Sequence, residues 1–295
     1  MEVTTGVRLP NEELPRDDTH APARPRDDPR RSGPLLVAHR SHRADAFPRP
    51  AAVDALILDL EDAVAPADKP AARKSVVDWL GDGREAWVRI NDATTPHWGE
   101  DLDAVAGLPG LSGVMLAKTE SGGQVEATRE RLPDGTRIIT LIESAVGLEA
   151  APEIARAEGT FRLAFGSGDF RRDTGMSDDV LAMAYPRSRL VIASRAARLP
   201  GGPIDGPTVS ANDTILQRDC QATVSLGLTG KLCLHPDQAP AVNRALSPDA
   251  HDIAWAREVI AELGTDGERV RDGSDLPRLA KAKKLTHLAG EFGLV

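Results

Sequence analysis

Two carboxylate side chains stand directly after apolar runs of this chain, in positions that could bind a metal ion. Glu143 follows the apolar run 138–142, and Asp169 follows Phe165 after a Gly-Ser-Gly stretch. One βα unit separates them, so they would end neighbouring strands and could share a cation. Two carboxylates, with substrate oxygens and water, suit Mg²⁺, which prefers octahedral oxygen coordination. Spacing alone leaves open a second interpretation, in which each is an ordinary acid near a helix N-terminus.

A positively charged residue, Arg89, ends another apolar run and should point to the same place. Its planar guanidinium could hold a carboxylate or an enolate oxygen. Alternatively it forms a salt bridge with the acidic stretch Asp59–Asp62, and the two interpretations are compatible. That stretch is dense in acid for a partly buried strand end, which implies cationic partners or metal-bound water. For Asp62, plain solvation is the favoured interpretation.

Further polar residues follow other apolar runs. Lys118 and Glu120 come after a fourth run, and His235 precedes a proline, which is typical of a hydrogen-bonded structural histidine. Gly166 and Gly168 allow the backbone to approach a ligand closely, but they do not form the three-glycine dinucleotide motif.

Length and composition favour one large α/β domain in a reducing compartment. The chain has 295 residues, 41% of them hydrophobic and only 3% aromatic, so small aliphatic side chains must supply most of the core. Its net charge of −9 and the lack of a sustained basic run argue against nucleic acid as a partner. The sequence shows no signal peptide or membrane-spanning stretch, and its two cysteines lack metal-type spacing. We expect a cytoplasmic enzyme without a membrane partner.

The elements that must position these residues are βα units. Short aliphatic runs alternate with helical patterns from residue 35 onward, which is typical of a parallel sheet, and (β/α)8 barrels carry catalytic residues at the carboxyl ends of strands. We therefore expect an α/β fold, a (β/α)8 TIM barrel with a C-terminal helical extension. The expected strands are 35–38, 55–60, 86–90, 113–117, 137–142, 161–165, 203–205 and 231–234. The expected helices are 69–80, 121–131, 147–157, 179–199 (divided in two at Pro186), 213–226, 240–246, 249–263 and 276–288.

The same pattern divides the chain into three segments. Residues 1–33 are rich in Pro, Asp and Arg, a composition typical of a flexible tail. Residues 34–247 would form the catalytic barrel, and residues 248–295 a helical lid or oligomerisation segment. Glycine-containing stretches at 264–267 and 272–274 are its expected hinges.

Six segments together resemble the HpcH/HpaI aldolase and citrate lyase β-subunit (CitE-like) family, in its CoA-ester lyase branch. They are LDLEDAV (58–64, followed by Lys69 and Arg73), VRIN (88–91), MLAKTES (115–121), LIESAVGL (141–148), LAFGSGD (163–169) and GKLCLHPDQ (230–238). They recur in the family's order and cover about residues 35–265. The resemblance implies Mg²⁺ bound by Glu143 and Asp169. The implied reaction cleaves or forms a 3-hydroxyacyl-CoA, of the malyl-CoA or citramalyl-CoA type, giving an acyl-CoA and a 2-oxo acid.

The resemblance also implies roles for single residues. Mg²⁺ would chelate the hydroxyl and carboxylate of the substrate, and Arg89 would stabilise negative charge on the enolate side. Three residues of the matching segments are expected to contact substrate: Glu61, Lys118 and Gly166.

The proton-transfer group is expected in the C-terminal segment. The family places an acid/base aspartate two residues before a proline, often supplied by the neighbouring subunit, and Asp275 is its counterpart here. The stretch before it is shorter than in the family, so a water molecule or Asp59 is the alternative. A homotrimer or hexamer is the expected assembly.

The first strand departs from the family, which commonly carries a Pro-Gly turn where this chain has His39 to Arg43. Arg40 and Arg43 remain available for the phosphates of CoA, but the acyl carrier could instead be a carrier protein, or the substrate a small non-thioester. The leading hypothesis is a Mg²⁺-dependent CoA-ester lyase. The alternatives are a class II aldolase acting on a free 2-oxo acid, and a non-catalytic subunit of a lyase complex. Neutralising Arg40 or Arg43 should weaken substrate binding only in the CoA lyase.

Overall fold

A parallel β-sheet forms the centre of the first part of the chain. The computed structural model describes residues 35–36 and 53–294, and within them eight strands pair in the order β1-β8-β7-β6-β5-β4-β3-β2. Every pairing is parallel, and the first strand lies beside the last. The strands are β1 (Leu35–Leu36), β2 (Ile57–Asp59), β3 (Ala86–Ile90), β4 (Leu111–Leu116), β5 (Ile138–Ile142), β6 (Thr160–Phe165), β7 (Ile204–Asp205) and β8 (Gly230–Cys233). This is an α/β fold with a curled parallel sheet, consistent with a TIM-barrel-like architecture.

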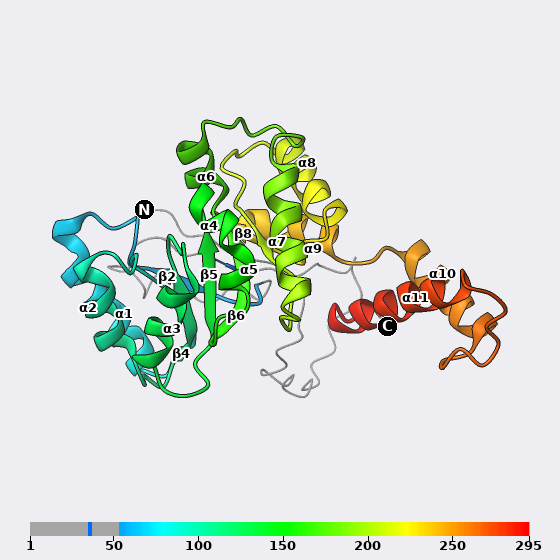
Figure 1. Cartoon of the computed structure of the whole chain (residues 1–295), viewed down its shortest axis with the longest axis horizontal. Coiled ribbons are helices and arrows are strands. Elements are labelled where there is room, and N and C mark those ends of the chain that lie inside the picture. Colours follow the sequence, from blue (N-terminus) through cyan, green and yellow to red (C-terminus); the bar gives the residue numbers. More distant parts are fainter. Residues whose placement is uncertain (1–34, 37–52, 295) are drawn as a thin grey trace, which may run out of the picture. The chain divides into compact units, whose positions relative to one another are not determined.

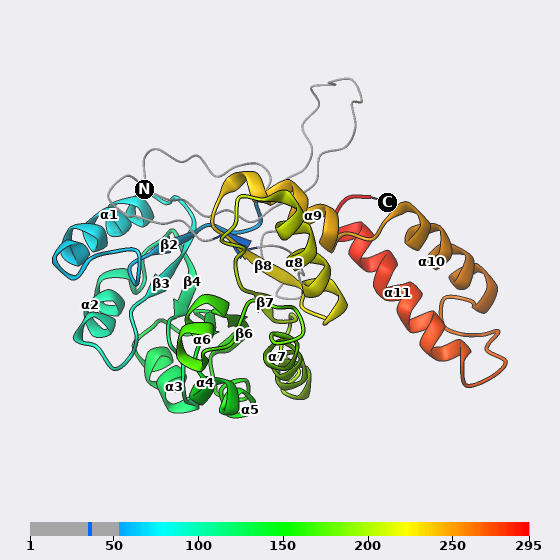
Figure 2. The ribbon, with the colours of Figure 1, turned by 90° about the horizontal axis from the view of Figure 1, so that it is seen from above.

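Helices follow the strands and cover the outer face of the sheet. Figure 2 shows α1, α2, α3, α7 and α8 arranged around the curled strands. The helices of this part are α1 (Lys69–Gly81), α2 (Pro96–Val105), α3 (Gly122–Glu130), α4 (Ala145–Glu149), α5 (Ala151–Ile154), α6 (Ser167–Thr174), α7 (Ala184–Ala196), α8 (Asp213–Ser225) and α9 (Ala239–Leu246), with 3-10 turns η2 (Pro66–Asp68) and η3 (Pro236–Gln238).

Burial on both faces explains why the strands read as continuous apolar runs. One cluster contains a residue from each of β2 to β8, among them Ile57, Met115 and Leu232. The larger cluster joins the opposite faces of β2 to β6 to the helices, for example through Val88, Val125 and Leu190.

Prolines are involved in three differences from the sequence-based expectation. The helix expected at 147–157 is divided into α4 and α5, and Pro152 stands at the start of α5. Pro186 does not break its helix, contrary to expectation, because it lies in the first turn of α7, where no intrahelical N–H bond is needed. Helix α2 was not expected from the sequence; it also begins with a proline, Pro96.

The C-terminal part forms a separate compact unit, which begins at Arg244. It contains α10 (Ala250–Leu263) and α11 (Asp275–Glu291), which lie side by side as a helical hairpin (Figure 1). Small and aliphatic side chains join the two helices, including Val259, Leu263, Leu279 and Ala282. The boundary expected from the sequence, between residues 247 and 248, lies four residues further on.

Within the described part of the chain, no helix combines the length and apolar character that crossing a membrane would require.

Candidate active site

The polar residues singled out from the sequence stand at the carboxyl ends of consecutive strands. Asp59 is the last residue of β2, Arg89 lies in β3, and Lys118 follows β4 by two residues. Glu143 comes directly after β5, and Asp169 lies in the first turn of α6, after β6. Parallel pairing brings these ends to one edge of the sheet.

Asp59 and Arg89 form a buried bidentate pair. The Arg89 Nε and Nη2 groups donate to the two carboxylate oxygens of Asp59, each over 2.7 Å. Asp59 is fully buried and also accepts hydrogen bonds from the backbone N–H groups of Glu61 and Ala63. Burial opposes the charge of Arg89, but the neighbouring Asp59 and Glu61 outweigh it and raise its pKa. The salt-bridge interpretation of Arg89 therefore holds, and Asp59 orients the guanidinium.

Glu61 links Arg89 to Lys118. Its Oε2 lies 3.3 Å from Arg89 Nη1, and its Oε1 accepts a hydrogen bond from Lys118 Nζ. Lys118 also donates to Asp62, over 3.1 Å. Burial raises the pKa of Glu61, whereas the two cations act against that rise. Negative and positive side chains therefore alternate in the order Asp59, Arg89, Glu61, Lys118 and Asp62.

Glu143 is buried next to these alternating charges. Its Oε1 accepts a 2.7 Å hydrogen bond from the backbone N–H of Lys118. The backbone of Lys118 is left-handed, with φ 47°, which is uncommon for residues other than glycine. Burial raises the pKa of Glu143 to about 8, Arg89 counteracts this, and the charges of Glu61 and Asp169 add to it. A Cβ on Gly166 would meet Glu143 Oε2 at 2.4 Å. Gly166 is thus required for the close approach of β6 to this carboxylate.

Asp169 has a buried oxygen that lacks a hydrogen bond. Within the described residues its Oδ2 has no hydrogen-bond partner, although Arg172 Nη2 lies at 3.2 Å and Lys118 Nζ at 4.0 Å. Burial raises the pKa of Asp169, and the charge of Asp62 adds to the rise. An acceptor left in this state costs free energy, which a bound cation would recover.

These observations fit a Mg²⁺ site held by Glu143 and Asp169. Burial penalises both carboxylates, the charge of Asp169 adds to the penalty on Glu143, and that of Asp62 adds to the penalty on Asp169. Both carboxylates keep an oxygen without a hydrogen bond among the described residues. A hard divalent cation with oxygen ligands would relieve the repulsion and complete the coordination of those oxygens.

The pH dependence of Mg²⁺ affinity should follow Glu143. Because its pKa is raised to about 8, Glu143 is mostly protonated at pH 6 and must release a proton when Mg²⁺ binds. We expect the apparent Mg²⁺ affinity to rise by about tenfold per pH unit below pH 8 and to level off above it. Calorimetric titration at pH 6, 7 and 8 measures this slope. A flat profile would contradict the assignment of Glu143 as a ligand.

Sequence reasoning missed the residues that hold the β2 loop in place. The buried Lys69 Nζ donates to the backbone oxygens of Leu60 and Glu61 and, over 2.7 Å, to Asn91 Oδ1. Asn91 in turn donates to Leu60 and to the buried Asp101. Only the presence of a lysine and an asparagine within the matching segments hinted at this network, because its members come from two different βα units.

Two other strand-end residues pair with side chains close to them in sequence or at the next strand end. His235 is exposed and sits 3.2 Å from Asp237, and Glu120 accepts a hydrogen bond from Ser144 over 2.5 Å. Arg40 and Arg43 lie outside the described residues, as does the tail at 1–33.

Asp275 is enclosed by arginines of its own helical hairpin. Its Oδ2 accepts from the backbone N–H and the Nε of Arg271, and its Oδ1 accepts from Arg278 Nη1 over 2.9 Å. Both arginines also contact Glu262 of α10. The hydrogen bonds from Arg271 lower the pKa of Asp275 to about 2. In these surroundings Asp275 is ionised and ties α11 to the preceding loop, and its expected acid/base role stays a prediction.

Replacing Asp275 by Asn should loosen the hairpin. The lowered pKa means that the charged form stabilises the fold above about pH 4, and that this contribution is lost as the pH falls toward 2. We expect D275N to speed amide hydrogen exchange in α10 and α11 at pH 7. Asp272, whose carboxylate accepts hydrogen bonds from the backbone N–H and the hydroxyl of Ser274, provides the control D272N. Equal exchange rates in the two variants would argue against the tying role.

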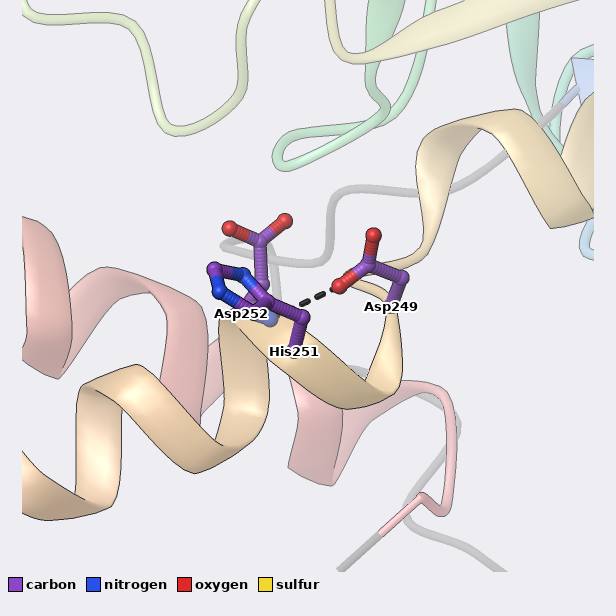
Figure 3. Close-up of side chains that lie close together, drawn as sticks. All are labelled: Asp249, His251 and Asp252. Atoms are coloured by element: carbon purple, nitrogen blue, oxygen red, sulfur yellow. Dashed lines mark hydrogen bonds between the residues drawn. The ribbon is translucent and has the colours of Figure 1, made fainter.

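A second acidic cluster starts α10. Figure 3 shows Asp249, His251 and Asp252 close together, with the backbone N–H of Asp252 donating to the Asp249 carboxylate over 2.7 Å. Asp249 is the N-cap of the helix, and its exposed position needs no ligand. We interpret the cluster as helix capping.

Known proteins are similar in sequence to this chain over most of its length. Residues 44–236 match the family described as HpcH/HpaI aldolase/citrate lyase, and residues 251–293 match the HpcH/HpaI aldolase C-terminal domain. The chain is 34% identical to a citrate lyase subunit beta-like protein of Mycobacterium tuberculosis, over 89% of this chain and 97% of that protein. It is 30% identical to the human mitochondrial citramalyl-CoA lyase, over 80% and 79% of the two chains.

A solved structure is similar as well. The crystal structure of protein CitE from Mycobacterium tuberculosis, in complex with magnesium, acetoacetate and coenzyme A, superposes with a TM-score of 0.75 at 32% sequence identity. The match covers 88% of this chain and 99% of that one.

Proposed function

The chain belongs to the HpcH/HpaI aldolase/citrate lyase family, and we propose that it is a Mg²⁺-dependent carbon–carbon lyase. Its proposed reaction cleaves or forms a 3-hydroxyacyl-CoA, of the malyl-CoA or citramalyl-CoA type, to an acyl-CoA and a 2-oxo acid. Relatives named citramalyl-CoA lyase and L-malyl-CoA/beta-methylmalyl-CoA lyase support this substrate class.

The observation that carries the proposal is a pair of carboxylates at the strand ends whose negative charge the surrounding residues stabilise poorly. Glu143 is buried with a pKa of about 8, and Asp169 keeps a buried oxygen without a hydrogen bond among the described residues. When bound there, Mg²⁺ would act as a Lewis acid on the hydroxyl and carboxylate of the substrate. Structures of CitE with magnesium and with acetoacetate or pyruvate support the same pairing of metal and small oxo acid.

Arg89 is placed to stabilise the negative charge that develops when the carbon–carbon bond breaks. Two of its five N–H donors are taken by Asp59, and this pair fixes the plane of the guanidinium. Nη1 also lies 3.3 Å from Glu61 Oε2, and a donor that neither carboxylate takes would face the enolate oxygen of the acyl-CoA. Asp59 is then a positioning residue, because its oxygens are occupied by Arg89 and by backbone N–H groups. Lys118 and Glu61 would contact the substrate beside it.

The proton on the acyl carbon needs a donor. We propose Asp275, supplied by a neighbouring copy in a homotrimer or hexamer, and this requires its release from Arg271 and Arg278. A water molecule is the alternative. The C-terminal hairpin would then act as a lid and an oligomerisation segment on a closed (β/α)8 barrel, which the pairing of β1 with β8 supports. Light scattering of the purified protein tests the assembly.

A ligand panel tests the function. Thermal shifts and turnover would be measured with acetyl-CoA and propionyl-CoA, each with glyoxylate or pyruvate, with and without Mg²⁺. We expect condensation only when Mg²⁺, a CoA ester and a 2-oxo acid are all present. Condensation or cleavage of free 2-oxo acids without CoA would establish the aldolase instead. Neither binding nor turnover of any CoA ester would indicate a non-catalytic subunit.

A further inference from the structure

A cavity lies beside α6, on the side away from Asp169. It encloses about 330 Å³ and is bounded by α6, the residues before α7, the loop after β7 and the start of α8. Ser167 and Arg171 line it, and each stands two residues from Asp169. Residues two apart on a helix point away from each other, so the cavity is separate from the proposed metal site although one helix carries both.

A buried arginine lines this cavity with part of its hydrogen-bonding capacity unused. Arg187 is only 7% exposed, and its Nε donates to Asp205 Oδ1 over 2.8 Å. Within the described part of the chain its two Nη groups make no hydrogen bond, although Arg187 faces the cavity. The Nη groups are not sealed in the core but open into the cavity, so an acceptor bound there could pair with donors that no described protein acceptor takes.

The charges around Arg187 leave it incompletely neutralised. Asp205, its partner, is fully buried and is shared with Lys231, whose Nζ lies 3.6 Å away. Thr223 also donates to the same carboxylate, over 2.5 Å. One carboxylate therefore faces two buried cations.

The rim of the cavity carries further charge. Arg218 is paired with Asp219 over 2.9 Å, and Asp219 also accepts from Thr208. Among the described residues Arg171 donates to a backbone oxygen of its own helix, over 3.3 Å, and the exposed Asp178 also lines the cavity. Asp179 also acts on Arg218, so with Lys231 behind the wall four cations face four carboxylates. The preference for an anion therefore rests on the Arg187 Nη donors that line the cavity, not on net charge.

We propose that this cavity binds the phosphate or carboxylate group of a small organic molecule, with the Arg187 Nη groups as the main donors. A guanidinium presents parallel N–H groups that match two oxygens of such a group. The Ser167 hydroxyl would add a donor, and Gly206 leaves room for it, because a Cβ there would meet Ser167 Oγ at 2.2 Å.

The rest of the lining indicates an organic ligand rather than a bare ion. Met183, Val209 and Ile215 supply apolar surface, and a cavity of about 330 Å³ has room for a short carbon skeleton beside the anionic group. The site does not depend on the proposed lyase reaction, since none of its residues belongs to the proposed metal or substrate site.

Calorimetry without Mg²⁺ tests the proposal, using inorganic phosphate and glycerol 3-phosphate as probes in a chloride buffer. We expect both to bind, glycerol 3-phosphate more tightly. R187K keeps a positive charge beside Asp205 but loses the paired N–H groups, and R171Q removes a half-exposed rim charge. Each should weaken binding at least about tenfold. R195Q, at an exposed position of α7 outside the cavity, is the matched control and should bind as the wild type does.

The binding measurements can overturn the proposal or identify the source of the anion. If neither probe binds, or if R187K and R171Q bind both probes as well as the wild type, the proposal is overturned. Should R187K fail to fold, R171Q against R195Q decides. Competition with CoA identifies the source of the anion: displacement of phosphate by CoA would assign the cavity to a phosphate of CoA, and independent binding would assign it to a free metabolite.

Discussion

Replacing Glu143 by Gln should abolish Mg²⁺-dependent turnover while leaving the metal-free protein at least as stable as the wild type. The amide removes a charge that burial disfavours, as the pKa of about 8 shows, and it keeps the side chain's shape. We expect kcat to fall by about 10³-fold or more, and Mg²⁺ affinity by more than about 100-fold. Turnover assays and calorimetric titration with Mg²⁺ measure the two losses.

The stability of the same variant separates loss of metal from misfolding. For the wild type without metal, a folded-state pKa raised to about 8 means that stability falls as the pH rises from about 4.5 to 8. E143Q should lack that decline and should be more stable than the wild type at pH 8. Glu149, an exposed residue of α4, gives the control E149Q. Wild-type turnover in E143Q would remove Glu143 from the metal site.

Replacing Arg89 by Lys should reduce both turnover and stability. Lysine cannot reproduce the two 2.7 Å bonds to Asp59 together with the contact to Glu61, so a fully buried carboxylate loses part of its pairing. We expect the free energy of unfolding to fall by about 2 kcal/mol and kcat by about 10²-fold or more. Chemical denaturation and steady-state kinetics measure these effects.

Arg131 provides the matched control for the Arg89 variant. It forms a surface ion pair with Asp103 over 2.6 Å, and R131K should change stability by less than about 1 kcal/mol. Unchanged turnover in R89K would show that positive charge alone suffices and that the fixed guanidinium plane has no part in the reaction.

The alternation of strands and helices was readable from the sequence because each strand is a short aliphatic run buried on both faces. Strand β3 occupies 86–90 as expected, and β5 begins one residue later than expected. Proline positions were less informative, since Pro186 is harmless in a first helical turn and Pro96 starts a helix that the pattern did not reveal.

The sequence by itself determined which residues stand at strand ends, and therefore that Glu143, Asp169, Arg89 and Lys118 would meet at one edge. This follows from local order, because the residue after an apolar run is fixed at the end of its strand. Only the tertiary structure decided how each side chain is used. Arg89 meets Asp59 across 30 positions, and Lys118 meets Glu61 across 57.

The same limit applies to the surroundings of Gly166, Asp275 and Arg187. Gly166 makes room for Glu143, Asp275 is enclosed by Arg271 and Arg278, and Arg187 lines a separate cavity. Each of these roles depends on which atoms surround the residue after the strands and helices have packed. Periodicity along the chain carries no information about those neighbours, so the carboxylate pair could be foreseen from the sequence and its surroundings could not.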